Sequence, residues 1–192
     1  MKTQILLGFL AALAATPAMA ALKPGDMAPD FTAQGSLGGK PFTFNLKQAL
    51  KKGPVLVYFY PSAYTGGCDL EAHTFAEESA KFTAAGAQIL GVSADNLDRL
   101  KVFSADPNFC AGKFPIASDA DTKIAASYDL AVGAARTGAK DVRGQEIGHA
   151  FIERVTYVIG KDGKILATLS SKTDGLSPDQ HVEKSLAIVA AK

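Results

Sequence analysis

The chain has 192 residues, 47% of them hydrophobic, and 20 Lys and Arg against 19 Asp and Glu, for a formal net charge of +1. This balance argues against a polyanionic partner such as nucleic acid. The length and the apolar fraction suffice for one domain with a sizeable core, which excludes a miniature scaffold that depends on disulfides.

The first twenty residues have the pattern of a secretory signal peptide. Lys2 is followed by an apolar run from Ile5 to Ala15 and then by the small-x-small sequence Ala18-Met19-Ala20. The run is too short to favour spanning a bilayer, and no stop-transfer segment follows it. We therefore expect residues 21–192 to be a formally neutral mature domain, periplasmic or secreted, with no membrane contact.

The first half of this domain predicts a hairpin followed by a βαβ unit. Two short extended runs at 31–33 and 41–44 flank a turn cluster from Gly35 to Gly39, which predicts an N-terminal hairpin. Residues 54–60 form an unbroken β-branched and aromatic run, typical of a strand buried on both faces. Apolar spacing then predicts a helix to about residue 85, and residues 88–93 predict a second buried strand. Such a unit favours parallel pairing with the helix as the crossover.

The second half alternates helix, loop and hairpin signals. Asp95 is placed to cap a helix that Pro107 ends just before Cys110, which leaves this cysteine in a poorly constrained segment. Residues 131–150 lack periodicity and predict a long loop. Asp162-Gly163 lies between two strand-like runs and predicts a hairpin, and residues 177–180 predict the cap of a closing helix. The expected fold class is α/β, a mixed sheet with helices on both faces.

Cys68 and Cys110 are the two cysteines of the chain. In an oxidising compartment, two cysteines ordinarily suggest one structural disulfide. Together with three scattered histidines (His73, His149 and His181) they match no spacing of a structural zinc site, so we expect neither a metal nor another cofactor.

Cys68 lies where a buried strand turns into a helix. If Thr65 is the N-cap, Cys68 is the third helical residue, close to the unpaired amides and the positive end of the helix dipole. This placement predicts a thiol pKa below the ordinary value of about 8.5 and hence a reactive thiolate at neutral pH. The alternative without a function is that Thr65 is only a good N-cap and that Cys68 is a small buried hydrophobic residue.

The string from Pro61 to Cys68, PSAYTGGC, resembles the P-x-x-x-T-x-x-C signature of peroxiredoxins. The resemblance covers nearly the whole mature chain, since residues 23–31, 114–119 and 154–159 are similar to the family's entry segment, middle strand and Arg-bearing strand. Within the family, the chain is most similar to the bacterioferritin-comigratory, or Q, subfamily. The resemblance implies a thioredoxin-like fold and a thiol-dependent peroxidase acting on hydrogen peroxide or organic hydroperoxides.

The resemblance also assigns roles to residues around Cys68. Cys68 becomes the peroxidatic nucleophile, Thr65 a hydrogen-bond partner of peroxide and thiolate, and Pro61 a shield against water. Arg154 steadies thiolate and substrate. These roles are physically reasonable, because charge develops on the leaving oxygen, where a guanidinium and two backbone amides can stabilise it.

Two further positions bind substrate or orient the cation in this assignment. The amide of Gly67, with that of Cys68, completes the clamp on the leaving oxygen. Glu71 matches the family's acidic position and is placed to orient Arg154, although a glutamate in a first helical turn usually compensates the dipole. Tyr64 either lines the peroxide mouth or packs in the loop.

Attack on peroxide leaves Cys68 as a sulfenic acid, which condenses with a nearby thiol. Cys110 is the one other cysteine, and the resemblance makes it the resolving cysteine; the version with a resolver five residues after the first is excluded, because His73 stands there. A disulfide requires Cα atoms within about 7 Å, so we expect local unwinding near Gly66, Gly67 and Pro107.

Two other classes of protein remain as alternatives. An exported disulfide oxidoreductase is disfavoured, because that class uses C-x-x-C and Cys68 is followed by Asp69-Leu70-Glu71. A binding module with a structural 68–110 disulfide predicts no response to peroxide. For the peroxidase, we expect an exported dithiol protein or a small thiol as reductant, a monomer or weak dimer, and resistance of Cys68 to sulfinic acid formation.

Overall fold

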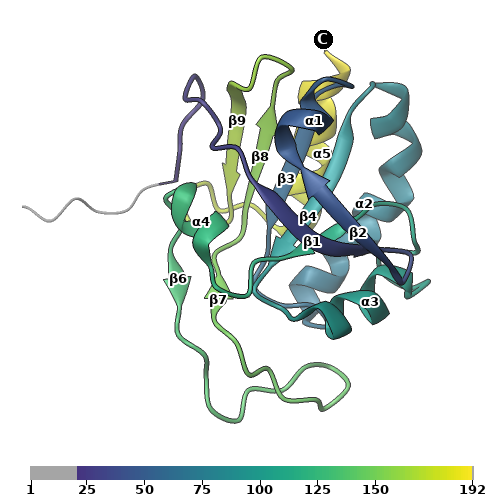
Figure 1. Cartoon of the computed structure of the whole chain (residues 1–192), viewed down its shortest axis with the longest axis vertical. Coiled ribbons are helices and arrows are strands. Elements are labelled where there is room, and N and C mark those ends of the chain that lie inside the picture. Colours follow the sequence, from purple (N-terminus) through teal and green to yellow (C-terminus); the bar gives the residue numbers. More distant parts are fainter. Residues whose placement is uncertain (1–20, 192) are drawn as a thin grey trace, which may run out of the picture.

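A computed structural model describes residues 21–191 of the chain, so the expected signal peptide lies outside the described residues (Figure 1). A seven-stranded sheet has the order β2-β1-β5-β4-β3-β8-β9. Its strands are β1 (Thr32–Leu37), β2 (Lys40–Asn45), β3 (Val55–Phe59), β4 (Gln88–Ser93), β5 (Ile116–Ser118), β8 (Val155–Ile159) and β9 (Ile165–Ser170). Two shorter strands, β6 (Val132–Gly133) and β7 (Phe151–Ile152), pair with each other.

In the described part of the chain, five helices lie on the two faces of this sheet, in agreement with the predicted α/β class. They are α1 (Leu46–Leu50), α2 (Gly66–Ala84), α3 (Leu97–Ala105), α4 (Lys123–Ser127) and α5 (Pro178–Ala190). The apolar residues of α2, α3 and α5 join one hydrophobic cluster, and those of α1 and α4 join a second cluster on the opposite face.

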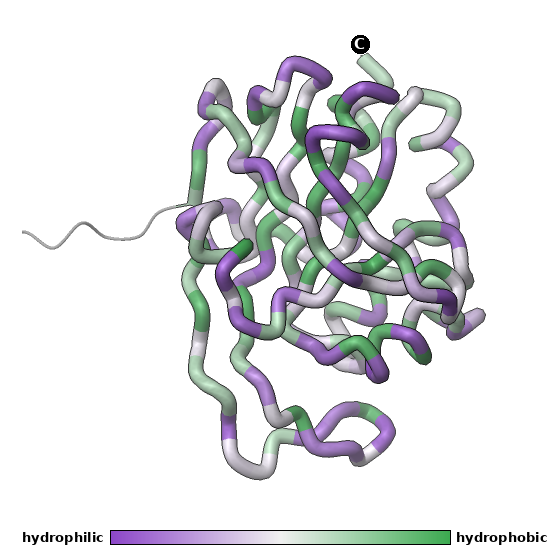
Figure 2. The backbone as a smooth tube through the Cα atoms, viewed as in Figure 1, coloured by the Kyte–Doolittle hydropathy of each residue, from purple (hydrophilic) through white to green (hydrophobic). Residues whose placement is uncertain are grey.

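The central strand β3 separates these two clusters by simple alternation. Val55, Val57 and Phe59 face the α1 side, whereas Leu56 and Tyr58 face the α2 side. All five are buried, which explains the unbroken apolar run in the sequence. Hydrophobic segments accordingly follow the central strands in the tube view (Figure 2).

The predicted supersecondary units are confirmed. β3 and β4 are parallel with α2 as the crossover, and β8 and β9 form the hairpin around Asp162-Gly163. The N-terminal hairpin is also present, but its turn is only Gly38-Gly39, with φ of 56° and 80°. Gly35 belongs to β1, where a Cβ would lie 2.1 Å from the Ile116 carbonyl oxygen, so the absence of a side chain permits the pairing with β5.

Two predictions about the α3 region are wrong. The N-cap is Asn96, whose side chain accepts a hydrogen bond from the Arg99 amide, while the Asp95 carboxylate turns toward the loop after β3. Cys110 is fully buried in a segment of consecutive turns, in which the amides of Phe109 and Ala111 both donate to the Asp106 carbonyl. The segment after Pro107 is therefore well constrained.

The short helices α1 and α4 were not predicted, because five residues carry no readable periodicity. The long loop at 131–150 is present, with its ends tied together by β6 and β7. Within residues 21–191, the helices are all too short or too polar to cross a membrane.

Candidate active site

The sheet places Cys68 and Arg154 at the same end of the molecule. Thr65 is the N-cap of α2, with extended backbone, and Cys68 is the third helical residue, as predicted. β3 and β8 run antiparallel with Phe59 opposite Val155, so Arg154 stands beside the exit of β3 toward this helix. Residues 86 positions apart are thus brought together by strand pairing.

Cys68, Arg154 and Glu71 form one buried contact chain. Arg154 Nη2 donates to Cys68 Sγ at 3.1 Å, and Nη1 pairs with the Glu71 carboxylate. The Arg154 side chain is 10% exposed and that of Glu71 is fully buried. Glu71 therefore orients the guanidinium from inside the domain, rather than compensating the helix dipole at the surface.

The prediction that the Cys68 pKa is lowered is wrong for the buried arrangement that the structure shows. Burial is the largest influence and raises the pKa of the thiol, whereas the Arg154 charge and hydrogen bonding by Ser62 and Thr65 lower it. The position at a helix start does not offset the loss of water, because Cys68 is only 2% exposed. Thiolate formation at this site therefore depends on Arg154.

Burial acts on both partners of the ion pair. It raises the pKa of Glu71 to about 7, although Arg154 lowers it. For Arg154, burial opposes the charged form, but the charges of Glu71 and Cys68 outweigh it and leave the pKa above its ordinary value. Each charge is thus costly to bury, and each depends on its partner.

A histidine to which no sequence motif assigns a role lies behind this pair. His181 on α5 is fully buried, with Nδ1 2.9 Å from the Thr156 hydroxyl and 4.0 Å from a Glu71 carboxylate oxygen. Its Nε2 is 3.0 Å from the Ser171 hydroxyl. Burial, followed by the Arg154 charge, lowers its pKa to about 4, so this imidazole is neutral. In the sequence, the position of His181 next to Val182 on the apolar face of the closing helix is the feature that could have indicated its burial.

Gly67 makes the approach of Arg154 possible. A Cβ at this position would lie 3.3 Å from Arg154 Nη2 and 3.3 Å from Pro178 Cγ at the start of α5. At the neighbouring Gly66, a Cβ would meet open space. Neither glycine has a positive φ, so the requirement at Gly67 is steric and not conformational.

The other residues that the sequence predicts at the site lie around the contacts between Cys68, Arg154 and Glu71. Pro61 is half-buried in the loop between β3 and α2, and the Thr65 hydroxyl donates to the Ser62 carbonyl at 2.8 Å. Tyr64 is 2% exposed and packs on Phe103 and Phe109, with ring centroids 4.9 and 5.4 Å apart, so it does not line an open mouth.

The two cysteines are both free and both buried. They belong to the same hydrophobic cluster, on the α2 face of the sheet. Burial raises the pKa of Cys110 well above its ordinary value, and the nearby Asp106 and Asp69 add to this effect. His73 is exposed on α2, and its Nδ1 lies 2.9 Å from the carbonyl oxygen of Asn108 in the Cys110 segment.

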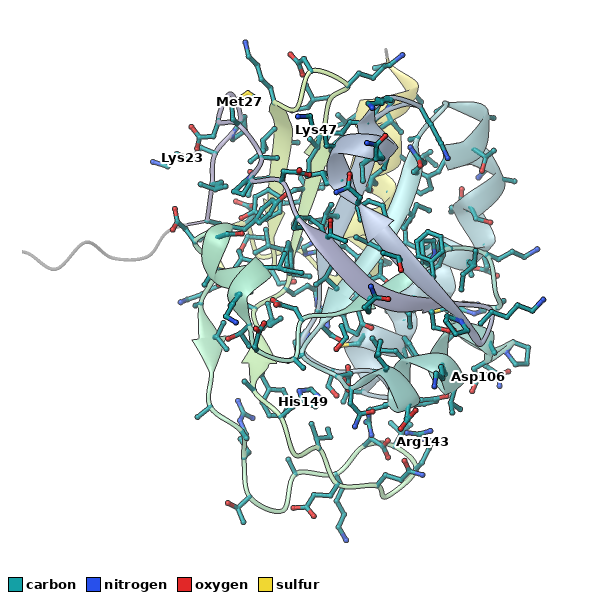
Figure 3. All side chains as sticks on the ribbon, in the orientation of Figure 1. Lys23, Met27, Lys47, Asp106, Arg143 and His149 are labelled. Atoms are coloured by element: carbon teal, nitrogen blue, oxygen red, sulfur yellow. The ribbon has the colours of Figure 1, made fainter. Side chains whose placement is uncertain are left out.

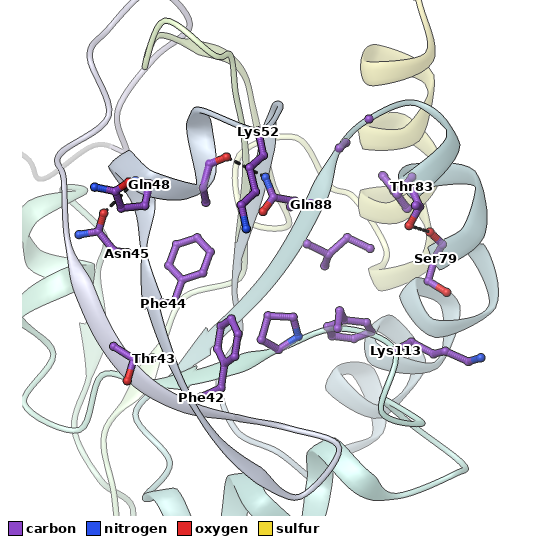
Figure 4. A pocket seen from close by; sticks show the side chains of 17 residues that line it. Phe42, Thr43, Phe44, Asn45, Gln48, Lys52, Ser79, Thr83, Gln88 and Lys113 are labelled. Atoms are coloured by element: carbon purple, nitrogen blue, oxygen red, sulfur yellow. Dashed lines mark hydrogen bonds between the residues drawn. The ribbon is translucent and has the colours of Figure 1, made fainter.

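A separate apolar pocket of about 550 Å³ is lined by aromatic side chains that include Phe42, Phe44, Phe82 and Phe114 (Figure 4). The residues that line this pocket do not include Cys68, Arg154 or Glu71. The chemistry-bearing residues therefore lie outside this pocket, in the compact site at the start of α2.

Comparisons with known proteins match this site and fold to one family. The model of the AhpC/TSA family matches residues 24–168. A putative peroxiredoxin of Mycobacterium tuberculosis is 34% identical over 146 residues, which cover 76% of this chain and 83% of the relative. The chloroplastic peroxiredoxin Q of Sedum lineare is 27% identical over 86% of this chain and 76% of its own length.

Solved structures of peroxiredoxins have the same fold as this chain. The peroxidoxin BcpB of Mycobacterium tuberculosis superposes with a TM-score of 0.68 at 30% identity, covering 88% of this chain and 97% of that structure. Peroxiredoxin Q of Xanthomonas campestris superposes with a TM-score of 0.59 at 28% identity, covering 82% and 89%. The mixed sheet with flanking helices is thus the thioredoxin-like fold of these proteins.

A Gly67→Ala substitution should slow oxidation of Cys68 by hydrogen peroxide about tenfold, because the added methyl group forces the Arg154 guanidinium to shift by a few tenths of an ångström from its position beside Sγ. Stopped-flow competition with a reference peroxidase measures this rate constant. Gly66→Ala is the matched control, since it adds the same methyl group to the same helical turn in open space. Equal rates in the two variants would contradict the steric requirement.

The pH dependence of stability should report Glu71. Between about pH 4.5 and pH 7 the folded protein holds a proton on this carboxyl that the unfolded chain releases, so the contribution of Glu71 to the free energy of unfolding should fall as the pH rises through this window. His181, whose pKa is lowered to about 4, contributes in the opposite direction, so the Glu71 contribution is read from the difference between wild type and a Glu71 variant. Denaturant titrations of wild type and Glu71→Gln at about pH 5 and about pH 8 test this. The control Glu183→Gln, whose carboxyl is exposed on α5, should keep the pH dependence of the wild-type free energy of unfolding. If the free energies of unfolding of wild type and Glu71→Gln differed by the same amount at both pH values, the prediction would be wrong.

Proposed function

Because the chain belongs to the AhpC/TSA family and is a thiol peroxidase of the peroxiredoxin Q type, we propose that Cys68 attacks the peroxide and that Cys110 then resolves it. The observation that carries this assignment is the 3.1 Å contact between Cys68 Sγ and the Arg154 guanidinium. Within residues 21–191, no comparable cation acts on Cys110, and the carboxylates of Asp106 and Asp69 lie near it. Of the two thiols, Cys68 is therefore the better nucleophile.

The first step is a displacement at oxygen. The Cys68 thiolate attacks one peroxide oxygen, the O–O bond breaks, and the second oxygen leaves as water or an alcohol after taking up a proton, so that Cys68 becomes a sulfenic acid. Arg154 stabilises the thiolate before attack and the leaving oxygen during it. The first-turn amide of Gly67 adds a donor on the same side. The predicted second donor, the Cys68 amide, is instead occupied by a 2.8 Å hydrogen bond to the Thr65 carbonyl.

The neighbouring residues support this step in the same proposal. The Thr65 hydroxyl, which donates to the Ser62 carbonyl, can turn to hydrogen-bond a bound peroxide. Pro61 contributes no amide donor at the end of β3 and limits the access of water. Glu71 acts through Arg154, and His181 keeps its neutral ring against the carboxylate, so both are positioning residues.

In the second step, Cys110 attacks the sulfenic sulfur, and water leaves as the disulfide forms. A thioredoxin-like dithiol then returns two electrons and restores both thiols. Since Lys2 and the small-x-small sequence at 18–20 indicate export, we place this cycle in the periplasm or outside the cell, with an exported dithiol protein or a small thiol as reductant and the enzyme as a monomer or weak dimer.

Mass spectrometry of the reduced domain, before and after one equivalent of hydrogen peroxide, tests both assignments. Wild type should lose two protons and contain a 68–110 linkage, whereas Cys110→Ser should accumulate Cys68 sulfenic acid. Cys68→Ser should consume peroxide no faster than a free thiol. A slow and nonspecific reaction in the wild type would instead leave the pair as a structural disulfide without a peroxidase role.

A further inference from the structure

The loop between β6 and β7 is docked onto the segment that leads to Cys68. Its ends are tied by the β6 and β7 pairing, and its inner part, residues 139–149, is here called the clamp segment. Arg143 and His149 lie where this segment meets the rest of the domain (Figure 3). The segment contacts Ser62 and Tyr64 directly, and it reaches Ala63 through Asp95 and Arg99. These three residues come immediately before the Thr65 cap.

A buried cluster of charges forms the base of this contact. Arg99 on α3 pairs with Asp95 at 2.9 Å and with Asp141 of the clamp segment at 2.8 Å. Both carboxylate side chains are fully buried, and that of Arg99 is 10% exposed. Arg143 adds a second pair to Asp141 at 2.7 Å. Removal of Asp141 would therefore leave Arg99 and Arg143 without a shared partner.

The same cluster holds the backbone before Cys68. The Ala63 amide donates to Asp95 at 2.8 Å, and its carbonyl accepts from Arg99 at 2.8 Å. The Ser62 hydroxyl donates to Asp95 at 3.1 Å. Asp95 therefore serves this loop, which explains why Asn96 replaces it as the cap of α3.

The clamp segment also closes directly over Tyr64. The amide of Val142 donates to the Tyr64 carbonyl at 3.0 Å, and the Arg143 guanidinium lies 3.3 Å from the centre of the Tyr64 ring. Tyr64 has a φ of 60°, a left-handed conformation that a residue with a side chain rarely adopts without external support. Its ring packs on Phe109, next to Cys110, so Tyr64 connects the two cysteine-bearing segments.

We propose that Asp141 and the clamp segment are a positioning device that holds Ser62, Ala63 and Tyr64 in the conformation that reacts with peroxide and must release them before Cys68 pairs with Cys110. This inference rests on the proposed two-cysteine cycle. Both sulfurs are buried and unbonded. Cys68 is held in the first turn of α2 and Cys110 in a hydrogen-bonded run of turns, so in this proposal both segments loosen before the disulfide forms. Release of Tyr64 frees the Cys68 segment and uncovers Phe109 in one step. The strength of the clamp then sets the rate of the second reaction.

Asp141→Asn is the decisive variant, because it removes the shared carboxylate charge with almost no change in shape. We expect the disulfide step to become about tenfold faster and amide hydrogen exchange over residues 61–68 of the reduced protein to increase. Quenched-flow mass spectrometry gives the first quantity, and exchange mass spectrometry gives the second without any peroxide. Glu146→Gln is the matched control, since it removes a like charge from an exposed position of the same segment.

Arg143→Gln provides a second test if Asp141→Asn folds poorly. It removes a partly exposed cation and its contact with Tyr64, so the same changes should appear at about twofold to fourfold. Unchanged exchange over residues 61–68, or a disulfide rate that stays equal to that of Glu146→Gln, would overturn the proposal. A wild type that forms no 68–110 disulfide would contradict the resolving role of Cys110 instead, and exchange alone would then decide whether the clamp holds the loop.

Discussion

The ion pair between Arg154 and Glu71, in contact with Cys68, is the constraint on which the site depends. A thiolate in a buried position needs a cation, and a buried cation needs a carboxylate. Glu71 supplies that carboxylate one helical turn after the cysteine, and His181 occupies the space behind it with a neutral ring. The charges can therefore be buried in apolar surroundings only because Glu71, Arg154 and Cys68 contact one another in this order, from the core to the sulfur.

The sheet makes this arrangement possible. Arg154 precedes the first residue of β8, and the antiparallel register of Phe59 with Val155 brings it to the end of β3 from which the Cys68 segment leaves. The start of α5 closes the site from the other side, with Pro178 beside Gly67. The absence of a side chain at this glycine is thus a packing requirement that three elements share.

Local features of the fold were predictable from the sequence, whereas the chemical environment was not. The apolar run of β3, the Thr65 cap and the Asp162-Gly163 turn each depend on neighbouring residues, and each was identified correctly. Burial of a charge depends on tertiary contacts, so the rise in the Cys68 pKa on burial could not be predicted from neighbouring residues. The same reason explains the error at Asp95, whose partners at positions 62, 63 and 149 lie far away in the chain.

The type of contact at the clamp segment suits a structure that has to open and close. Burial alone would lower the pKa of His149, but its hydrogen bond with Asp95 and the Asp95 charge leave that pKa above its ordinary value, so this contact too is charge-assisted. Ion pairs and backbone hydrogen bonds can be replaced by contacts with water, and buried ion pairs contribute little net stability compared with apolar packing. The charged cluster therefore holds one loop geometry through contacts that water can replace when the loop opens, as the two successive reactions proposed for Cys68 require.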